Sequence, residues 1–165
     1  MTLVLVPVAV PVVEALAAGD LEAARTLSGL PLTDYFVTGE ARALWERRLV
    51  QIAADPGTLD WIARPAVVDG AVVGHAGFHL PPDGDGRVSI SYAVDPAHRR
   101  RGHARAMLAA LLERARTEPA VRIVRAEISP GNAASLATIA GAGFVRVGEQ
   151  WDEEDGLEIL FETAA

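Results

Sequence analysis

Three arginines and a glycine stand side by side in one short stretch of the chain, between Val94 and Arg105, which reads Val-Asp-Pro-Ala-His-Arg-Arg-Arg-Gly-His-Ala-Arg. Guanidinium groups pair with phosphate oxygens, and a glycine lets such an oxygen approach the backbone closely. The stretch is therefore a candidate phosphate-binding turn. A solvated basic turn would have the same composition, so the residues alone leave both interpretations open.

Regular elements are expected on both sides of this turn. Arg87–Val94 alternates as a strand does, and a set of small and apolar residues recurs at helical spacing after the turn. That set is Ala104, Met107, Leu108, Leu111, Leu112 and Ala115. Because the first N–H groups of a helix lack intrahelical partners and carry partial positive charge, a strand–turn–helix crossing favours an anion at the turn.

The order of residues in and before the turn matches a known family. Arg99-x-x-Gly102-x-Ala104 fits the Arg/Gln-x-x-Gly-x-Gly/Ala signature, and it follows a small-Val-x-Pro segment, here 93–96. In both features the chain resembles the GCN5-related N-acetyltransferases, the GNAT superfamily. The resemblance implies a turn that binds the pyrophosphate of acetyl-CoA through backbone N–H groups.

A second block of the chain strengthens this resemblance. Asn132, Ser135 and the pair 143–144 look like the family's Asn-x-x-Ser…Gly-Phe segment. The resemblance covers about residues 60–163 well, and the chain looks similar to the branch that acetylates ribosomal-protein N-termini. It implies acetyl-CoA as the acetyl donor and no metal. The cofactor-binding residues that it implies are Tyr92, Ala93, Val94, Arg99, Arg100, Arg101, Gly102, His103, Ala104, Arg105, Asn132 and Ser135.

Glu127 is the candidate catalytic residue. In the family a primary amine attacks the acetyl thioester directly in a ternary complex, and several members carry a catalytic glutamate five residues before the position of Asn132. Ligands of α/β sheets bind beyond the carboxyl ends of parallel strands, and a partly buried carboxylate there would have a raised pKa. We expect Glu127 to act as the base. The alternative is an exposed glutamate paired with Arg125 or a loop arginine.

One position departs from the family pattern. Many members carry a tyrosine seven residues after the position of Asn132 to protonate the leaving thiolate, and this chain has Ile139 there. Its two tyrosines, Tyr35 and Tyr92, lie elsewhere, and Ser135 is a weak substitute. Because a thiol has a pKa of about 8.5, the thiolate can leave and take a proton from water.

Other ionisable groups compete for roles in catalysis. His75 and His79 share one face of an expected strand, about 13 Å apart, which is too far for one metal. His79, at the strand end, is the better alternative base. The acidic run Asp152–Asp155 either attracts a cationic amine or is merely solvated.

The N-terminal third is expected to be mostly helical. Leu3–Ala18 is almost all apolar, but it lacks a basic start and contains two prolines and a glutamate, which favours a strand and a helix over an export signal. Asp20 and Thr38 are expected helix N-caps. Between those two helices, Tyr35 and Phe36 either touch the acceptor or pack beneath the helices.

The remaining pattern predicts the fold. Expected strands are Trp61–Val68, Val72–His79, Arg87–Val94, Arg122–Ile128, Phe144–Trp151 and Leu157–Glu162, with a helix from Asn132 to Ala142. The fold class is α/β: a GNAT-like, mostly antiparallel mixed sheet with flanking helices. Its central parallel pair is Arg87–Val94 beside Arg122–Ile128, since a helix connects them. We expect one domain over residues 1–165.

Composition narrows the class of protein further. The chain has 165 residues and a net charge of −7, which argues against nucleic acid as a partner. It has no cysteine, which excludes disulfides, thiolate zinc sites and a cysteine nucleophile and fits a reducing, cytoplasmic location. No apolar run approaches the ~20 residues of a membrane span, so no membrane contact is expected.

Three functions fit these observations. The first is an acetyl-CoA-dependent N-acetyltransferase acting on a protein N-terminus, and the second acts on a small-molecule amine. The third is a non-catalytic acyl-CoA-binding module, since Ile139 replaces the family's acid and Glu127 has the alternative interpretation given above. Many relatives pair as dimers, so a homodimer stays open. The acceptor and the acyl length cannot be read from the sequence.

Overall fold

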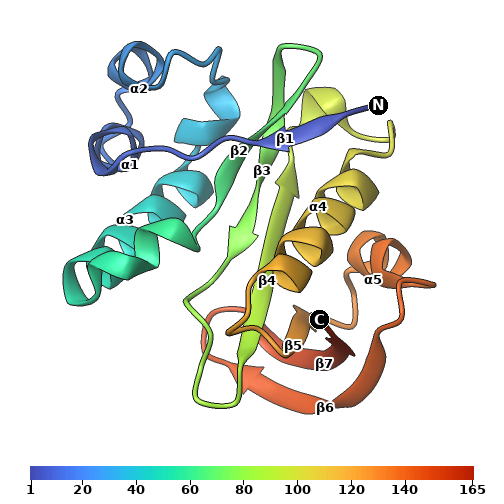
Figure 1. Cartoon of the computed structure of the whole chain (residues 1–165). Helices are drawn as coiled ribbons and strands as arrows, with labels where there is room; N and C mark the ends of the chain where they lie inside the picture. The colour runs from blue at the N-terminus through green and yellow to red at the C-terminus, as the bar shows by residue number, and fades with distance from the viewer.

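A computed structural model describes all residues, 1–165, as a seven-stranded sheet flanked by helices (Figure 1). The strands are β1 Leu3–Leu5, β2 Arg64–Val68, β3 Ala71–Phe78, β4 Arg87–Val94, β5 Ile123–Ile128, β6 Val145–Asp152 and β7 Gly156–Ala164. The helices are α1 Val10–Ala17, α2 Leu21–Ser28, α3 Gly39–Ala54, α4 His103–Thr117 and α5 Ala133–Ile139. Short 3₁₀ turns are η1 Asp34–Val37, η2 Pro56–Asp60 and η3 Pro96–His98.

The sheet has the order β1-β2-β3-β4-β5-β7-β6, and its one parallel pair is β4 with β5. This confirms the predicted fold class. The β2–β3 hairpin turns at Asp69 and Gly70, whose φ angles of 50° and 81° suit a tight two-residue turn. β4 has the predicted bounds, whereas β2 begins at Arg64 and not at Trp61, since Trp61 ends the η2 turn.

The two faces of the sheet carry separate apolar cores, with α1–α3 on one face and α4 and α5 on the other (Figure 1). Trp45, Phe36 and Leu16 are buried in the first core, and Met107 and Leu111 in the second. Phe36 stacks on Trp45 with ring centroids 6.1 Å apart. Of the two interpretations of Phe36, packing beneath the helices is therefore confirmed.

Local sequence signals place most helix ends. Asp20 accepts a hydrogen bond from Ala23 N at 3.0 Å, and Thr38 accepts one from Ala41 N at 3.2 Å, so both predicted N-caps are confirmed. The end of α5 is wrong by three residues: the helix stops at Ile139 and not at Ala142. The backbone leaves the helical region at Ala140, whose ψ is 128°, and Gly141 follows with a positive φ of 79°. None of the helices combines the length and the apolar character needed to cross a membrane.

Candidate active site

The site lies where two parallel strands separate. β4 and β5 pair from Arg87↔Ile123 to Ser89↔Arg125, and no further. Beyond that point, residues 90–94 of β4 pair only with β3 on their other side. The edge of β4 that faces β5 is therefore free over these residues, and its N–H and C=O groups are available to an extended ligand.

A cavity of about 710 Å³ opens along this free edge and extends to the N-terminus of α4. The predicted cofactor residues that line it are Tyr92, Ala93, Val94, Arg99, Arg100, Gly102, His103, Ala104, Arg105, Asn132 and Ser135. Arg101 is the one member of the predicted set outside the lining. Ala134 and Thr138 also line the cavity and were missed, although Thr138 stands three residues after Ser135 and four after Ala134, spacings that share one side of a helix.

The arginine turn has the backbone of an anion site. Arg100 and Gly102 both have positive φ, 60° and 82°, and Gly102 is the N-cap of α4, where it supplies no side-chain hydrogen bond. The first N–H groups of α4 are thus left for a ligand, beside the charges of Arg99 and Arg105. A non-glycine residue held in the left-handed region costs energy and is typical of binding sites.

A buried carboxylate ties this turn to the N-terminal part of the chain. Asp95 accepts a hydrogen bond from Thr33 Oγ1 at 2.6 Å through one oxygen and from Ala97 N at 3.0 Å through the other. Arg99 Nε also donates to the Val94 carbonyl at 3.2 Å. The cap of the η3 turn is readable from the sequence, since Asp precedes Pro, but the contact with Thr33 is not.

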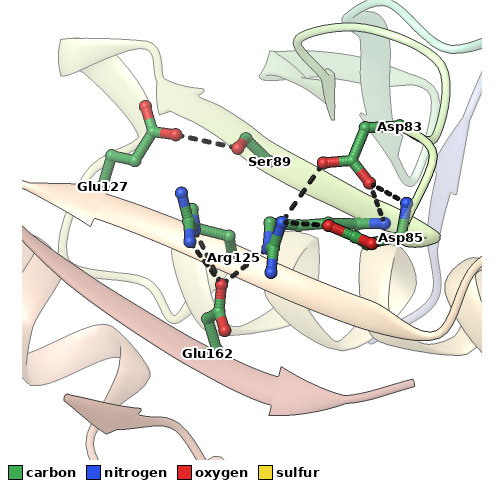
Figure 2. Close-up of polar contacts among 7 residues, drawn as sticks. Asp83, Asp85, Ser89, Arg125, Glu127 and Glu162 are labelled. Atoms are coloured by element: carbon green, nitrogen blue, oxygen red, sulfur yellow. Dashed lines mark hydrogen bonds and ion pairs between the residues drawn. The ribbon is translucent and has the colours of Figure 1, made fainter. Parts of the chain in front are cut away.

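Glu127 lies at the mouth of the opening between the strands. It accepts a hydrogen bond at 2.9 Å from the Oγ of Ser89, the last residue of β4 that pairs with β5 (Figure 2). Arg125 bonds Glu162 instead, with its Nη2 2.7 Å from a carboxylate oxygen. The alternative in which Arg125 neutralises Glu127 is therefore wrong.

Glu127 lines a second cavity of about 220 Å³, which shares Tyr92, Asn132 and Ser135 with the first. Asp155 and Glu158 line it too. Because these three residues line both cavities, the two spaces adjoin. The Glu127 carboxylate therefore lies next to the cavity that the predicted cofactor residues line.

Glu158 is a buried carboxylate in this second cavity that sequence reasoning missed. Burial raises its pKa, and the charge of Glu127 raises it further, although Gln150 Nε2 donates to it at 2.8 Å. Nothing in its spacing on β7 separates it from solvent-facing glutamates. Its environment arises only when β6 and β7 pair.

The acidic run of the β6–β7 hairpin divides into two roles. Asp152 accepts hydrogen bonds from the backbone of Glu154 and Asp155, and these bonds lower its pKa. It therefore shapes the turn. Glu154 and Asp155 instead line a third cavity, of about 410 Å³, that also touches α3 and the η1 turn.

The two histidines have different environments. His75 is buried among aromatic rings, with Trp45 at 5.3 Å and Phe36 at 5.5 Å, and burial followed by the charge of Arg48 lowers its pKa to about 4. His79 lines both the second and the third cavity. Burial and Arg48 lower its pKa as well, so it is neutral at neutral pH.

α5 has no tyrosine at the position where many family members carry the acid, since this chain has Ile139 there. Ile139 is buried in the apolar core. Tyr35, from the η1 turn, lines the third cavity, and burial raises the pKa of its hydroxyl. The Tyr92 hydroxyl is buried and has no hydrogen-bond partner.

Residues 25–144 match the family model described as the acetyltransferase (GNAT) family. Two curated relatives are each named mycothiol acetyltransferase. The one from Thermomonospora curvata is 44% identical over 79 residues, which are 48% of this chain and 25% of the relative. The one from Kineococcus radiotolerans is 38% identical over 104 residues, 61% of this chain and 32% of the relative. The matched segments thus span only about a quarter to a third of these relatives.

Solved structures share the fold over nearly the whole chain. An aminoglycoside acetyltransferase in complex with coenzyme A is 18% identical, with a TM-score of 0.67, over 99% of this chain and 95% of that one. The ribosomal-protein-alanine N-acetyltransferase from Brucella melitensis is 24% identical, with a TM-score of 0.62, over 100% of both chains. At these identities the similarity concerns the fold.

Proposed function

Since the chain belongs to the GNAT acetyltransferase family, we propose that it transfers the acetyl group of acetyl-CoA to a primary amine by direct attack in a ternary complex. One observation carries the proposal above all others. The cavity of about 710 Å³ runs from the free edge of β4 to the arginine turn, and the Glu127 carboxylate lines the space next to it.

The donor is held at two places in this scheme. The pyrophosphate binds the first N–H groups of α4 and the arginines of the turn, 99–105. The pantetheine arm pairs with the free edge of β4 at residues 92–94, and Asn132 bonds it from α5. Asn132 keeps its capping role at the same time, since its Oδ1 accepts from Ser135 N at 3.1 Å and its amide group remains available.

The acceptor amine enters from the opposite side, through the second and third cavities. Its ammonium form gives a proton to Glu127, which Ser89 holds in place. The neutral nitrogen then attacks the thioester carbon, and the nitrogen of the resulting tetrahedral intermediate releases its second proton to water. The C–S bond breaks, and the thiolate takes a proton from water. The acetyl group is then part of an amide, and the acetylated acceptor leaves the site. Proximity supplies much of the rate, because both substrates are bound before the reaction.

The acceptor is a protein N-terminus or a small-molecule amine. The solved neighbours include an aminoglycoside acetyltransferase and a ribosomal-protein-alanine N-acetyltransferase, so this fold supports both classes. The alternative function, an acyl-CoA-binding module without catalysis, shares the same cavity. Release of free thiol from acetyl-CoA in the presence of an amine panel separates the enzyme from the binding module.

The decisive test of the donor site is Gly102→Glu. The added carboxylate would lie among the α4 N–H groups and repel a pyrophosphate, so we expect no measurable acetyl-CoA binding by calorimetry. Gly29→Glu is the matched control: Gly29 also has positive φ, 70°, and open space around it, but it lies at the end of α2. Both variants lose about 1 kcal/mol of stability from backbone strain. Unchanged affinity in Gly102→Glu would reject the assignment.

A further inference from the structure

Arg48 is a buried cation without a counter-charge. It lies on the inner face of α3 and is 3% exposed. Its Nη1 donates to Gln51 Oε1 at 2.9 Å and to the His79 carbonyl at 3.3 Å, and its Nε is buried without a partner. Both acceptors are neutral. A buried charge is costly unless it is paired, so the chain alone leaves this guanidinium incompletely satisfied.

The charged groups near Arg48 do not supply the missing counter-charge. Burial and, to a lesser extent, the charge of Arg47 together lower the pKa of Arg48 to about 10, so Arg48 is still a cation at neutral pH. Glu154 of the hairpin, which lines the same cavity, is bonded to Arg47 at 3.0 Å. No carboxylate of the chain pairs with Arg48 itself.

A second unsatisfied group lines the same space. Both Arg48 and His75 line the third cavity, of about 410 Å³, and the His75 Nδ1 is buried without a partner. His75 is 4% exposed. Two buried polar groups without partners in one cavity indicate a ligand with a matching group, and an anionic oxygen is what a guanidinium requires.

The arginines line only one of the two adjoining spaces. Arg47 and Arg48 line the third cavity together with Glu40, Glu154 and Asp155, whereas Glu127, Asp155 and Glu158 line the second, which has no arginine. The two cavities share His79, Ser91, Tyr92 and Asp155, so one small molecule can reach both. Its cationic amine would lie beside the carboxylates and its acidic group beside Arg48.

We propose that Arg48, with His75, binds the carboxylate of the acceptor, and that the acceptor is a small amino-acid-like molecule carrying both an amine and a carboxylate. This inference rests on the proposed function, since it assigns the acceptor of the same reaction. It selects the small-molecule class over a protein N-terminus. A cavity of this size falls within the range of small-molecule sites.

The test compares each amino acid with its carboxamide as acceptor. The wild-type protein prefers the acid by at least about tenfold in kcat/KM, because only the acid pairs with the guanidinium. In Arg48→Gln, the acid loses about 100-fold, mainly through KM, while the amide changes little. The preference disappears. Arg42→Gln is the matched control: this exposed arginine of the same helix bonds one backbone carbonyl, of Ala17, and lines none of these cavities.

A binding measurement makes the result independent of turnover. Calorimetry with an N-acetylated amino acid and with its amide reports the anion site even if no amine reacts. Weaker binding of the acid alone in Arg48→Gln, with acetyl-CoA affinity kept as evidence of folding, supports the site. Arg48→Lys, which keeps the charge, covers the case in which Arg48→Gln does not fold, and it retains part of the preference.

Three results are distinguishable. Equal use of acid and amide by the wild-type protein would overturn the inference while leaving the acetyltransferase intact. A peptide that reacts faster than every free amino acid would overturn it in favour of a protein N-terminus. Arg48-dependent binding of the acid without any turnover would support the anion site and reject the proposed enzymatic function.

Discussion

At the scale of single residues, Glu127 and Glu158 are the two carboxylates that compete to accept the ammonium proton. Both line the same cavity, but Gln150 donates to Glu158, and the raised pKa of Glu158 reflects burial and repulsion by Glu127. Glu127 has only the Ser89 hydroxyl as partner. It also lies next to the residues shared with the donor cavity. These contacts favour Glu127 as the base. Glu158 is then a neighbouring carboxyl group whose pKa the charge of Glu127 raises.

Glu127→Gln removes the base without changing the shape of the site. We expect kcat to fall about 100-fold at neutral pH while acetyl-CoA affinity is unchanged, because the amide cannot take the proton. The loss shrinks as the pH rises, since more of the amine is already neutral. Steady-state kinetics across pH, with calorimetry for the donor, measure both effects.

Two glutamine variants serve as controls for this change. Glu149→Gln, on the exposed side of β6, retains wild-type rates, and Glu158→Gln loses less than tenfold. A Glu127→Gln variant with wild-type kcat at neutral pH would remove Glu127 from the mechanism. A Glu158→Gln variant with the larger loss would transfer the role of base to Glu158.

At the scale of elements, β4 and β5 separate at the site but are joined by an ion cluster at their other end. Glu162 of β7 accepts from Arg125 of β5 and from Arg87 of β4, both at 2.8 Å (Figure 2). Arg87 also pairs with Asp83 in the loop before β4. This ion cluster joins three strands at the closed end, and the Ser89–Glu127 hydrogen bond follows it toward the site.

Glu162→Gln tests this cluster through its pH dependence. Burial tends to raise the pKa of Glu162, but the hydrogen bonds from Arg125 and Arg87 outweigh it, so the folded-state pKa lies below the usual value. The stabilisation is therefore present above the unfolded-state pKa and is lost as the pH falls through the lowered folded-state value. We expect the variant to lose about 1–2 kcal/mol at pH 7.

The difference in stability between Glu162→Gln and wild type should shrink as the pH falls below the unfolded-state pKa of about 4.3 and disappear once the pH has passed the lowered folded-state pKa. Urea unfolding at neutral and acidic pH measures it. Glu113→Gln, which breaks an exposed pair with Arg116, changes stability by less than about 0.5 kcal/mol at either pH. A Glu162 difference that stayed constant with pH would show that packing, not charge, is responsible.

Elements set by local pattern could be predicted from the sequence, and those set by distant contacts could not. The alternating pattern of residues 87–94 predicted the bounds of β4 correctly, and the arginine turn was found because its residues are consecutive. Arg48 was missed although it recurs with Trp45 and Ile52 at helical spacing, a charged residue in an apolar series. The contact between Thr33 and Asp95 spans 62 residues, and no local pattern encodes it.

At the scale of the whole molecule, the two apolar cores lie on opposite faces of one sheet, and the candidate site draws residues from both sides. Arg48 and Tyr35 come from the N-terminal side, and the arginine turn and Asn132 from the side of α4 and α5. Asp95 also joins the η1 turn to the cofactor turn. We propose that residues 1–165 act as one domain, because neither half completes the site.

A matched pair of core substitutions tests this unity. Leu16→Ala opens a cavity in the α1–α3 core and Leu111→Ala in the α4 core, and both leucines are fully buried. Each should lose about 3 kcal/mol. Because the cores share the sheet, each loss should shift the same single transition, followed both by circular dichroism and, with Trp61 and Trp151 replaced by phenylalanine, by the fluorescence of the buried Trp45. Leu27→Ala, at an exposed position on α2, stays within about 0.5 kcal/mol of the wild-type stability.

If Leu16→Ala instead separated an early fluorescence change from a later loss of sheet signal, the α1–α3 layer would unfold alone. The acceptor cavity would then be lost before the acetyl-CoA cavity, and binding of acetyl-CoA would protect only the second transition.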